Sequence, residues 1–303
     1  MRVCSLASSS KGNCTIVYND FEILIVDMGI SCKELEEKFN ILGLDISKVI
    51  GVLVSHEHGD HTKGLCGIAN KYNVPIYAHY YACDGVVRKG KISHDNIVRF
   101  RDTPFMVGTF KITTFNVSHD VYCVGFNIEE NDNKISIVTD LGYTTNDIVE
   151  RLYDSRLVIL EANHDEKMVV ASTKYPAVLK ARILGKYGHL SNINSAKVVM
   201  ALAQHNVKQV LFAHLSEENN TPDLCYKTIC DYLLSQKMKN RKYDADKEEL
   251  IDMIIEDIYA YDDYIDEVEL TLITRKEDMN DTFKQYEYGR ESTCPSWLRN
   301  CVK

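Results

Sequence analysis

Six consecutive residues, His56-Glu57-His58-Gly59-Asp60-His61, contain four side chains that can ligate a metal ion. His56, His58 and Asp60 are two positions apart, so on an extended segment they point to the same side, and His61 can reach round from the following turn. The second histidine follows two residues after the first, unlike the HExxH zinc helix. A histidine and aspartate cluster without cysteine is typical of an open catalytic metal site.

Three further candidate ligands each follow an apolar stretch that predicts a β-strand. His119 follows FNVS, Asp140 follows SIVT and His214 follows VLFA. Side chains at one rim of a sheet can face one cavity, even when they are far apart in the sequence. Each of these residues alone would be interpreted as an ordinary core or surface residue. Their repeated placement after a strand favours a shared metal site with the upstream cluster.

The elements that position these residues predict an α/β protein. Strands are expected at 2–6, 15–18, 21–26, 49–54, 75–78, 109–116, 122–129, 134–139, 157–160 and 210–213. Helices are expected at 31–42, 62–72, 173–186, 194–205 and 223–236. The apolar run at 49–54 indicates a strand buried on both faces, and the His/Asp cluster emerges from its end.

Four parts are expected along the chain. Residues 1–236 form a catalytic domain, 237–266 an acidic helical insert, 267–275 the final strand of the catalytic domain, and 276–303 a C-terminal tail. Residues 241–303 carry 9 Lys/Arg against 17 Asp/Glu, which leaves 26 against 27 in residues 1–240. The net charge of −9 therefore argues neither for nor against a polyanionic substrate, because the acidity lies away from the candidate site.

No segment predicts export or membrane insertion. The N-terminus turns polar after six residues, too soon for the apolar core of a signal peptide. No apolar run approaches the ~20 residues that a membrane helix needs. The ten cysteines are scattered singly without a CxxC pair, which is typical of reduced thiols. We therefore expect a cytoplasmic protein with no membrane partner.

The ordered set of candidate ligands resembles the metallo-β-lactamase superfamily. Its five motifs match Asp27, then His56/His58/Asp60/His61, then His119, Asp140 and His214. The resemblance implies a four-layer αββα sandwich. It also implies that His56, His58 and His119 bind one metal ion, that Asp60, His61 and His214 bind the other, and that Asp140 bridges them. Asp27 would orient the ligands.

Two divalent cations about 3.5–4 Å apart would supply the hydrolytic chemistry. A bridging water loses a proton near neutral pH and becomes the nucleophile, and the cations polarise the scissile bond. Because it would bind one of these cations, Asp60 is expected to be a catalytic residue. His/Asp sites accept zinc, manganese or iron, so the sequence leaves the metal open.

The superfamily cleaves β-lactams, thioesters and phosphodiesters, so the fold alone does not give the substrate. A complete HxHxDH motif suits hydrolases of the nuclease and glyoxalase types, whereas enzymes that open β-lactams typically change this motif. RNA-processing members with a large inserted domain carry it between the fourth and fifth motifs. Asp140 and His214 are 74 positions apart, too few to hold that domain.

Five segments in order, LASSSKGNC, SHEHGDH, LEANHD, YGHLSN and AHLSEENNTP, resemble the YycJ/VicX (WalJ) family over roughly residues 1–236. The resemblance implies a cytosolic metal-dependent nuclease acting on DNA, a 5′-to-3′ exonuclease linked to mismatch repair. The alternative is a small-molecule phosphodiesterase or a glyoxalase-type thioester hydrolase of the same fold. A non-catalytic protein of this fold would be expected to lack a ligand, and none is missing.

Several residues near the ligands are candidates for substrate contact. His189 precedes a helix and could protonate a leaving alkoxide, the interpretation we favour over a histidine satisfied by the loop backbone. The Ser/Gly/Asn turn before the second strand could bind a phosphate, or could simply be a hairpin loop. The substrate-binding candidates are Ser10, Asn13, Asn163, His164 and Ser191.

Positive and aromatic residues follow the metal motif. They could form a nucleic-acid track with rings that stack on unpaired bases, but such residues more often form a solvated face or a core. The cations are Lys63, Lys71, Arg88, Lys89, Lys91, Arg99 and Arg101, and the rings are Tyr72, Tyr77, Tyr80 and Tyr81.

Overall fold

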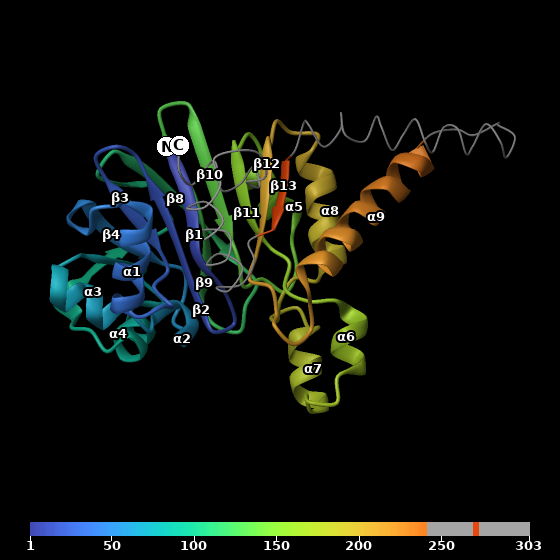
Figure 1. Cartoon of the computed structure of the whole chain (residues 1–303), viewed down its shortest axis with the longest axis horizontal. Coiled ribbons are helices and arrows are strands. Elements are labelled where there is room, and N and C mark those ends of the chain that lie inside the picture. Colours follow the sequence, from blue (N-terminus) through green and yellow to red (C-terminus); the bar gives the residue numbers. More distant parts are fainter. Residues whose placement is uncertain (241–268, 273–303) are drawn as a thin grey trace, which may run out of the picture.

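Two mixed β-sheets form the centre of the computed structural model, which describes residues 1–240 and 269–272 (Figure 1). The first sheet has the order β1 (Arg2–Ser9), β2 (Gly12–Tyr18), β3 (Ile23–Val26), β4 (Val49–Val54), β5 (Ile76–His79), β6 (Ile97–Phe100). The second sheet has the order β13 (Glu269–Leu272), β12 (Gln209–Ala213), β11 (Leu157–Glu161), β10 (Asn133–Val138), β9 (Cys123–Glu130), β8 (Phe110–Val117), β7 (Phe105–Val107).

Each sheet is antiparallel on one side and parallel on the other. The pairs β1–β2 and β2–β3 are antiparallel, and β3 to β6 pair in parallel. The pairs from β7 to β10 are antiparallel, and β10 to β13 pair in parallel. Parallel neighbours require crossover connections, which return the chain across one face of the sheet.

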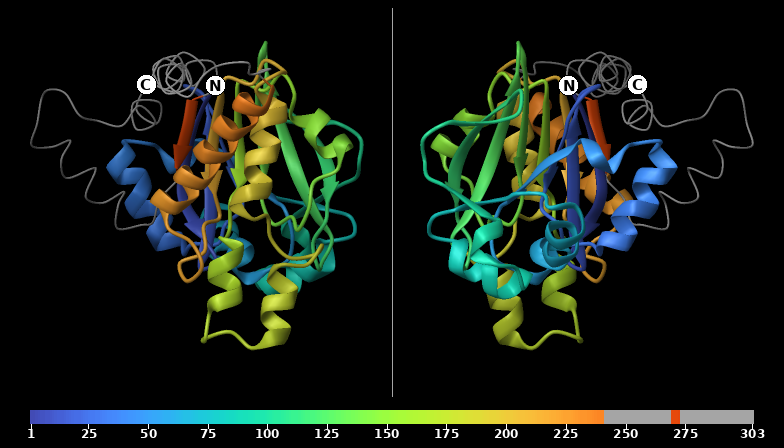
Figure 2. Two further views of the ribbon diagram at one scale, coloured as in Figure 1. Left: turned by 90° about the vertical axis from the view of Figure 1, so that its right-hand side faces the viewer. Right: turned by 90° about the vertical axis from the view of Figure 1, so that its left-hand side faces the viewer.

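The crossovers contain the helices. On the first sheet they include α1 (Cys32–Leu42), η1 (Ile46–Lys48), α3 (Leu65–Tyr72), α4 (Cys83–Gly90) and η2 (His94–Asn96). On the second they include α5 (Asn146–Leu152), α8 (Asn192–Leu202) and α9 (Pro222–Asn240). Figure 2 shows the gold and orange helices α8 and α9 on one outer face and the blue and teal helices on the opposite face.

Three apolar cores separate the layers. In β3, Ile25 belongs to the core beneath α1 and α3, whereas its neighbours Leu24 and Val26 belong to the core between the sheets. A third core lies between the second sheet and its helices and includes Val158 and Leu202. Because successive strand residues point to opposite faces, both sheets are covered on both sides. The expected α/β four-layer αββα sandwich is confirmed.

Two expected helices are interrupted. The expected helix at 62–72 is preceded by a separate short helix, α2 (Gly59–Thr62), and α3 begins only at Leu65. Between them, a Cβ on Gly64 would lie 2.0 Å from the carbonyl oxygen of Ile30, so the chain turns where only glycine fits.

The expected helix at 173–186 is also wrong in its bounds. The structure has α6 (Glu166–Ala171) and α7 (Ala177–Ile183) with Pro176 as the residue before α7. Proline disfavours a helical conformation in the residue that precedes it, so the helix cannot extend back through Tyr175. The two short helices project from the sandwich as a hairpin (Figure 1).

At the C-terminal edge, β13 pairs in parallel with β12, where the alternating pattern at 267–275 suggested a strand. Most of the acidic insert at 237–266 and all of the tail at 276–303 lie outside the described residues. The eight cysteines in the described part are free thiols. No helix in this part of the chain is long and apolar enough to cross a membrane.

Candidate metal centre

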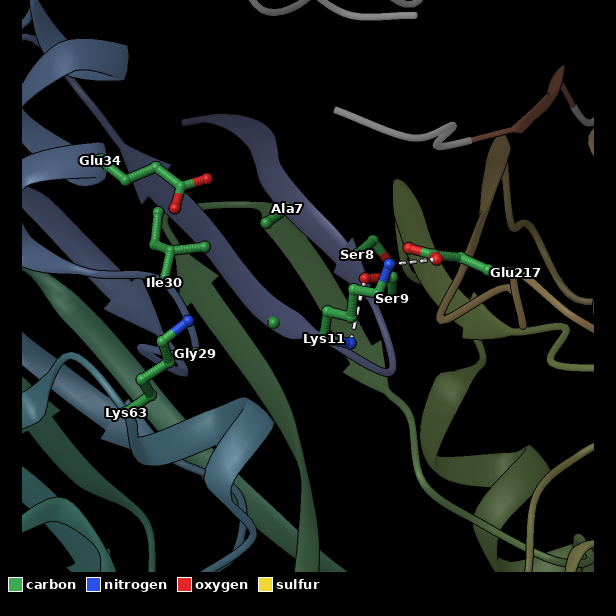
Figure 3. Close-up of a pocket in the computed structure, with 10 residues that line it drawn as sticks. Ala7, Ser8, Ser9, Lys11, Gly29, Ile30, Glu34, Lys63 and Glu217 are labelled. Atoms are coloured by element: carbon green, nitrogen blue, oxygen red, sulfur yellow. Dashed lines mark hydrogen bonds and ion pairs between the residues drawn. The ribbon is translucent and has the colours of Figure 1, made fainter. Parts of the chain in front are cut away.

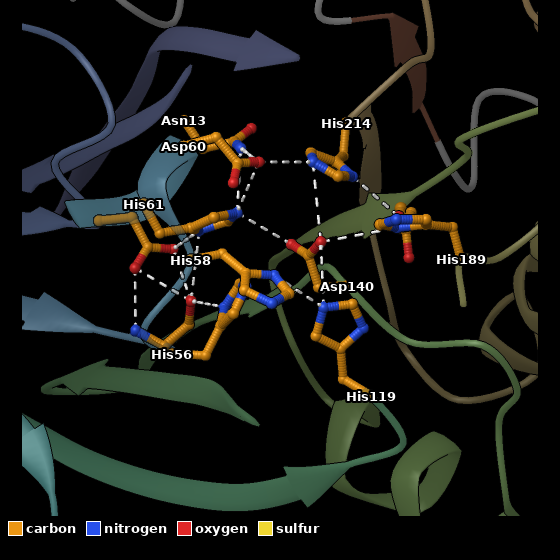
Figure 4. A network of polar contacts seen from close by, with 12 residues as sticks. Asn13, His56, His58, Asp60, His61, His119, Asp140, His189 and His214 are labelled. Carbon is orange, nitrogen blue, oxygen red and sulfur yellow. Dashed lines mark hydrogen bonds and ion pairs between the residues drawn. The ribbon is translucent and has the colours of Figure 1, made fainter. Parts of the chain in front are cut away.

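The candidate ligands gather where strands from both sheets end (Figure 4). His56 follows β4 with one residue between, and His119 follows β8 in the same way. Asp140 follows β10, again after one residue, and His214 follows β12 directly. The expected convergence of these distant residues is therefore what the structure shows.

Three of the strand-end residues have a left-handed backbone. The φ angles are 60° at Asp27, 59° at Asp140 and 58° at His214. Residues other than glycine adopt this region rarely, and in a folded protein it usually reflects a local requirement. Here it turns the chain sharply at the end of β3, β10 and β12, next to the ligand cluster.

One group of ligand atoms comes from His56, His58 and His119, whose atoms all lie within 4.8 Å of one another. Nδ1 of His58 is 3.3 Å from Nε2 of His119. Nε2 of His56 is buried and has no hydrogen-bond partner. These are the three residues expected at one metal ion.

A second group comes from Asp60, His61 and His214. Oδ2 of Asp60 is 3.4 Å from Nε2 of His61 and 3.5 Å from Nε2 of His214. Asp140 lies between the two groups: its carboxylate oxygens are 3.1 Å from Nε2 of His61 and 4.0 Å from Nε2 of His119. This is the arrangement expected of a carboxylate that bridges two ions.

The donor set fits a pair of divalent cations. Nε2 of His56 is buried without a hydrogen-bond partner, and the buried Oδ2 of Asp140 and Nε2 of His214 lie against other candidate ligands, an arrangement that is costly unless a cation lies among them. Burial disfavours a charged imidazole, yet Asp140, Asp60 and Glu161 raise the pKa of His214 to about 10. The carboxylates thus create a field that requires positive charge at this point.

Asp27 lies behind the ligands and holds two of them. Its Oδ2 is 2.8 Å from Nδ1 of His61, and its Oδ1 accepts a hydrogen bond of 2.8 Å from the Ser55 backbone N–H. Ser55 Oγ in turn is 3.0 Å from Nδ1 of His56. Nε2 of both histidines is thereby left facing the cluster, which is the geometry of a residue that orients ligands.

Glu161, which sequence analysis missed, has the corresponding position on the second sheet. It ends β11 and is fully buried, and its Oε1 is 2.9 Å from Nδ1 of His214 and 2.8 Å from Nδ1 of His189. Its Oε2 accepts hydrogen bonds from the backbone N–H groups of Leu141 and Leu190. The available signal was an acidic residue that ends an apolar strand, as at the other sites.

His189 lies beside the second group. Nδ1 of His189 lies on Glu161 Oε1, so Nε2 is the ring nitrogen without that contact. The His189 side chain is 21% exposed. Burial opposes the charged imidazole, but Glu161 and Asp140 outweigh this effect and raise the pKa of His189. His189 is therefore held by a carboxylate and not by the loop backbone alone.

Asn13 contacts the ligands themselves. Its Nδ2 is 3.3 Å from Oδ2 of Asp60 and 3.0 Å from Nε2 of His61, and its amide also bonds the backbone of Ser9. The backbone packs closely here, because a Cβ on Gly29 would lie 1.6 Å from the Asp60 carbonyl oxygen. Ser10 lies at the exposed tip of the same hairpin.

The other three substrate-binding candidates are buried in the scaffold. Asn163 donates a hydrogen bond of 2.8 Å to the His214 carbonyl oxygen. Burial lowers the pKa of the His164 imidazole to about 4, and its Nδ1 is 3.3 Å from Oδ1 of Asn163. Ser191 caps α8 and donates a hydrogen bond to Glu166. These contacts position the loops around His214 and His189.

Asp120 was also missed. Its Oδ1 lies 3.3 Å from Nε2 of His58 and 3.3 Å from Nε2 of His119, and its other oxygen pairs with Arg182 of α7. The α6–α7 hairpin is therefore tied to the rim of the first ligand group. The only sequence signal was its position directly after His119.

A cavity of about 370 Å³ lies along the β1–β2 hairpin, and its lining includes none of the seven candidate ligands (Figure 3). Its walls include Ser8, Lys11, Lys63 and Glu217, and Lys11 pairs with Glu217 at 2.6 Å. Ser8 Oγ accepts a hydrogen bond of 2.6 Å from the His214 backbone N–H, which joins the cavity wall to the ligand cluster. Cations, acids and hydroxyls all line this space.

Two cations of the predicted basic track form ion pairs with glutamates. Lys71 pairs with Glu36 at 2.8 Å and Arg88 with Glu57 at 3.0 Å. These two ion pairs make part of the track a salt-bridged surface, as the simpler interpretation proposed.

Comparisons with known proteins show the family. A family model described as "Beta-lactamase superfamily domain" matches residues 25–215. A Bacillus anthracis protein named exodeoxyribonuclease YycJ is 33% identical over 232 residues, which are 75% of this chain and 87% of that protein. A Streptococcus pneumoniae protein named exodeoxyribonuclease WalJ is 30% identical over 234 residues, 75% of this chain and 86% of that protein.

Solved structures share the fold at low identity. The metallo-β-lactamase-fold protein YhfI from Bacillus subtilis aligns with a TM-score of 0.58 and 16% identity, over 76% of this chain and 92% of that one. The short form of human tRNase Z aligns with a TM-score of 0.54 and 18% identity, over 72% and 93%. At these identities the likeness shows the architecture alone.

Proposed function

The chain belongs to the YycJ/WalJ-like family of metal-dependent hydrolases with the metallo-β-lactamase fold, and we propose that it is a 5′-to-3′ exodeoxyribonuclease. Its relatives that carry the exodeoxyribonuclease name align along 86–87% of their length. The observation that carries the proposal is the combination of a complete two-group ligand set with a histidine held at its edge by a buried carboxylate.

In this proposal His56, His58 and His119 would hold one divalent ion, Asp60, His61 and His214 would hold the other, and Asp140 would serve both. When bound, the ions supply Lewis acidity toward a phosphate and lower the pKa of water. Asp27 and Glu161 fix the tautomers of His61 and His214, because each carboxylate accepts from Nδ1 and leaves Nε2 for the ion.

His189 has the geometry of a general acid in the same reaction. Glu161 accepts from its Nδ1 and supports the protonated ring, so that Nε2 can give a proton to the leaving 3′-oxygen of the terminal nucleotide. Asn13 keeps the Asp60 carboxylate directed at the cluster. Hydrolysis of a DNA phosphodiester, whose leaving group is an alkoxide, needs both tasks, ligand orientation and leaving-group protonation.

The ions that suit these donors are zinc, manganese or iron, since imidazole and carboxylate ligands accept all three. The proposal also includes DNA as the macromolecular partner, a role in mismatch repair and a cytoplasmic location, which the family resemblance supports. Metal analysis of protein purified without chelator tests the identity of the ions. A raised mutation frequency in a deletion strain tests the repair role.

The activity is tested with 5′-phosphorylated and unphosphorylated DNA, each single- and double-stranded, in the presence of Mn²⁺ or Zn²⁺. A label on the 3′ end reports the direction of degradation, because a 5′-to-3′ exonuclease shortens the strand without releasing that label first. Ladder formation from the 5′ end is expected. Absence of cleavage on all four substrates would favour a small-molecule phosphodiesterase or a glyoxalase-type thioester hydrolase.

A further inference from the structure

Three tyrosine rings form a connected surface beside the metal centre; we name Tyr80, Tyr81 and Tyr122 the aromatic platform. Ring centroids are 5.5 Å apart for Tyr80 and Tyr81, and 5.3 Å apart for Tyr81 and Tyr122. Tyr80 is 45% exposed and Tyr81 is 65% exposed. Large rings exposed together are unusual on a surface with no binding role.

Buried residues hold the platform in place from below. The ring of His79, 1% exposed, stacks on Tyr122 at a centroid distance of 4.4 Å, and its Nδ1 is 3.3 Å from the Tyr81 backbone N–H. His79 also packs edge-on against Phe100 at 5.4 Å. The Tyr80 backbone N–H donates a hydrogen bond of 2.9 Å to the Phe100 carbonyl oxygen. The rings therefore stand on a rigid base.

Positive charge lies on the same surface. The guanidinium of Arg101 is 3.9 Å from the centroid of the Tyr80 ring. Among the described residues, no carboxylate forms an ion pair with Arg101. Its neighbour Asp102 pairs with His79 at 3.3 Å. An aromatic face next to an unpaired arginine suits a ligand with flat rings and a polyanionic backbone.

The platform is continuous with the metal centre. Tyr122 lies three residues after the candidate ligand His119, in the loop between β8 and β9. Two residues further on, in β9, the Val124 backbone N–H donates a hydrogen bond of 3.2 Å to the Ser55 carbonyl oxygen, next to His56. A nucleic-acid strand whose end reaches the candidate ligands can therefore extend over the platform.

The two other tyrosines of the predicted track do not contribute. Tyr77 stacks on Phe105 and packs against the core between the sheets. Tyr72 packs against the core beneath α1 and α3. Tyr122 also packs against both of these cores, so it forms the inner edge of the platform, and Tyr80 and Tyr81 are its exposed rings.

We propose that the aromatic platform binds unpaired bases of a single-stranded nucleic acid by stacking, with Arg101 facing the backbone. The inference rests on the proposed nuclease function and adds to it the state of the substrate: the segment next to the cleaved bond is unpaired. Stacking on aromatic side chains is tolerant of sequence because every base has a flat face. The platform therefore predicts a preference for single strands without a preference for a base.

The test measures binding of the metal-loaded protein to two strands of equal length: phosphorothioate-linked oligothymidine, and a matched strand with abasic positions. The wild type is expected to bind oligothymidine more tightly. Tyr81→Ala and Tyr80→Ala should each weaken that binding between about 5-fold and 100-fold and leave binding of the abasic strand unchanged. Tyr81→Phe, which keeps the ring, should bind as the wild type does.

Phe21→Ala is the matched control, because Phe21 is 80% exposed in the turn before β3, at the opposite end of that strand from Asp27. Turnover of bis(p-nitrophenyl) phosphate, too small to reach the platform, should be equal in all variants. Unchanged oligothymidine binding by the Tyr→Ala variants overturns the inference, as does an equal loss on both strands.

The same measurements separate this inference from the proposed function. A wild type that shows the base-dependent binding but cleaves no DNA leaves the platform standing and rejects the nuclease. A wild type that cleaves DNA while the platform variants keep their binding rejects the platform alone. A wild type that binds neither strand rejects both.

Discussion

Two buried carboxylates govern the orientation of the histidines. Asp27, at the end of β3, holds Nδ1 of His61, and Glu161, at the end of β11, holds Nδ1 of His214. The two pairs come from different sheets yet present Nε2 to the same space. Because a neutral imidazole has one donor and one acceptor nitrogen, fixing Nδ1–H on a carboxylate makes Nε2 the ligand atom.

Loss of a ligand should abolish turnover without unfolding the protein. We expect His58→Ala and Asp140→Ala to lose hydrolysis of both DNA and bis(p-nitrophenyl) phosphate, since His58 belongs to the first ligand group and Asp140 lies between the two. Circular dichroism should remain that of the wild type. Undiminished hydrolysis by either purified variant would contradict the two-ion mechanism.

Loss of His189 should have a different signature. His189→Ala is expected to keep its metal content and to lose between about 100-fold and 10,000-fold in kcat, the usual range for a missing general acid. Substrates with a good leaving group, such as p-nitrophenolate, should be affected least because they need no proton. A fall in metal content in parallel with the rate would make His189 a ligand instead.

The buried His164 should make stability sensitive to acid. Its pKa of about 4 lies below the ordinary 6.5, so the neutral form stabilises the fold fully above pH 6.5 and this contribution is lost as the pH falls toward 4. At about pH 5 the loss amounts to about 2 kcal/mol.

His164→Gln cannot titrate and should lack this dependence. Urea unfolding of both proteins at about pH 7.5 and about pH 5 should therefore show that the advantage of the wild type shrinks by about 2 kcal/mol. A difference that stays constant with pH would mean that His164 is already accessible to protons in the folded state.

At the level of elements, the strand ends were predictable and the turns were not. Apolar runs such as 49–54 and 157–160 predicted strands, and the polar residue after each strand predicted the site. Glu161 directly follows the expected strand at 157–160 and so carried the same signal, although it was not counted among the candidates. The pairing of Asp120 with Arg182 joins segments whose contact no local pattern encodes.

The helix errors have a local physical origin. Pro176 and Gly64 interrupt stretches whose apolar spacing is helical, because one excludes the preceding residue from a helix and the other allows an approach that a side chain would block. Substrate contact was harder still to predict. Asn163 and Ser191 are polar residues in site motifs, yet they bond to the scaffold.

The closeness of the β1–β2 hairpin to α2 yields a further prediction. Gly29→Ala would place a Cβ 1.6 Å from the Asp60 carbonyl oxygen and 2.5 Å from the Asn13 backbone nitrogen, so α2 must shift and carry Asp60 and His61 with it. We expect weaker metal binding, by about 10-fold or more, measured by competition with a chelating dye.

Gly59→Ala is the matched control for this effect. It lies in α2 itself, between His58 and Asp60, but a Cβ there would meet no atom within 4 Å. Metal affinity of this variant should equal that of the wild type. Equal weakening in both variants would show that α2 tolerates no added side chain, and would remove the argument from close approach.

For the whole molecule, the metal centre is a junction between the two sheets. His56 and His61 belong to the first sheet's connections, whereas His119, Asp140 and His214 belong to the second's. Ions bound only by the folded state stabilise it by about 2.7 kcal/mol per site at 100 times the dissociation constant. In a chain of this size that corresponds to a rise in Tm of about 4 °C per site, or about 8 °C for both.

Chelation should therefore lower Tm by about that amount, and added Mn²⁺ or Zn²⁺ should restore it. Differential scanning fluorimetry with and without EDTA measures the shift. Asp140→Ala should show a smaller response than the wild type, because one contact to each ion is missing. An identical Tm with and without chelator would mean that ion binding is not coupled to the docking of the sheets.

The left-handed backbone at Asp27, Asp140 and His214 bears on which substitutions can stabilise this protein. Each such position lowers stability by on the order of 1 kcal/mol relative to a relaxed turn. Substitution by glycine would remove this backbone strain. Aspartate and histidine at these positions therefore lower stability where their side chains serve the candidate metal centre. An engineered variant that gains heat resistance at these positions should be suspected at once of having lost its activity.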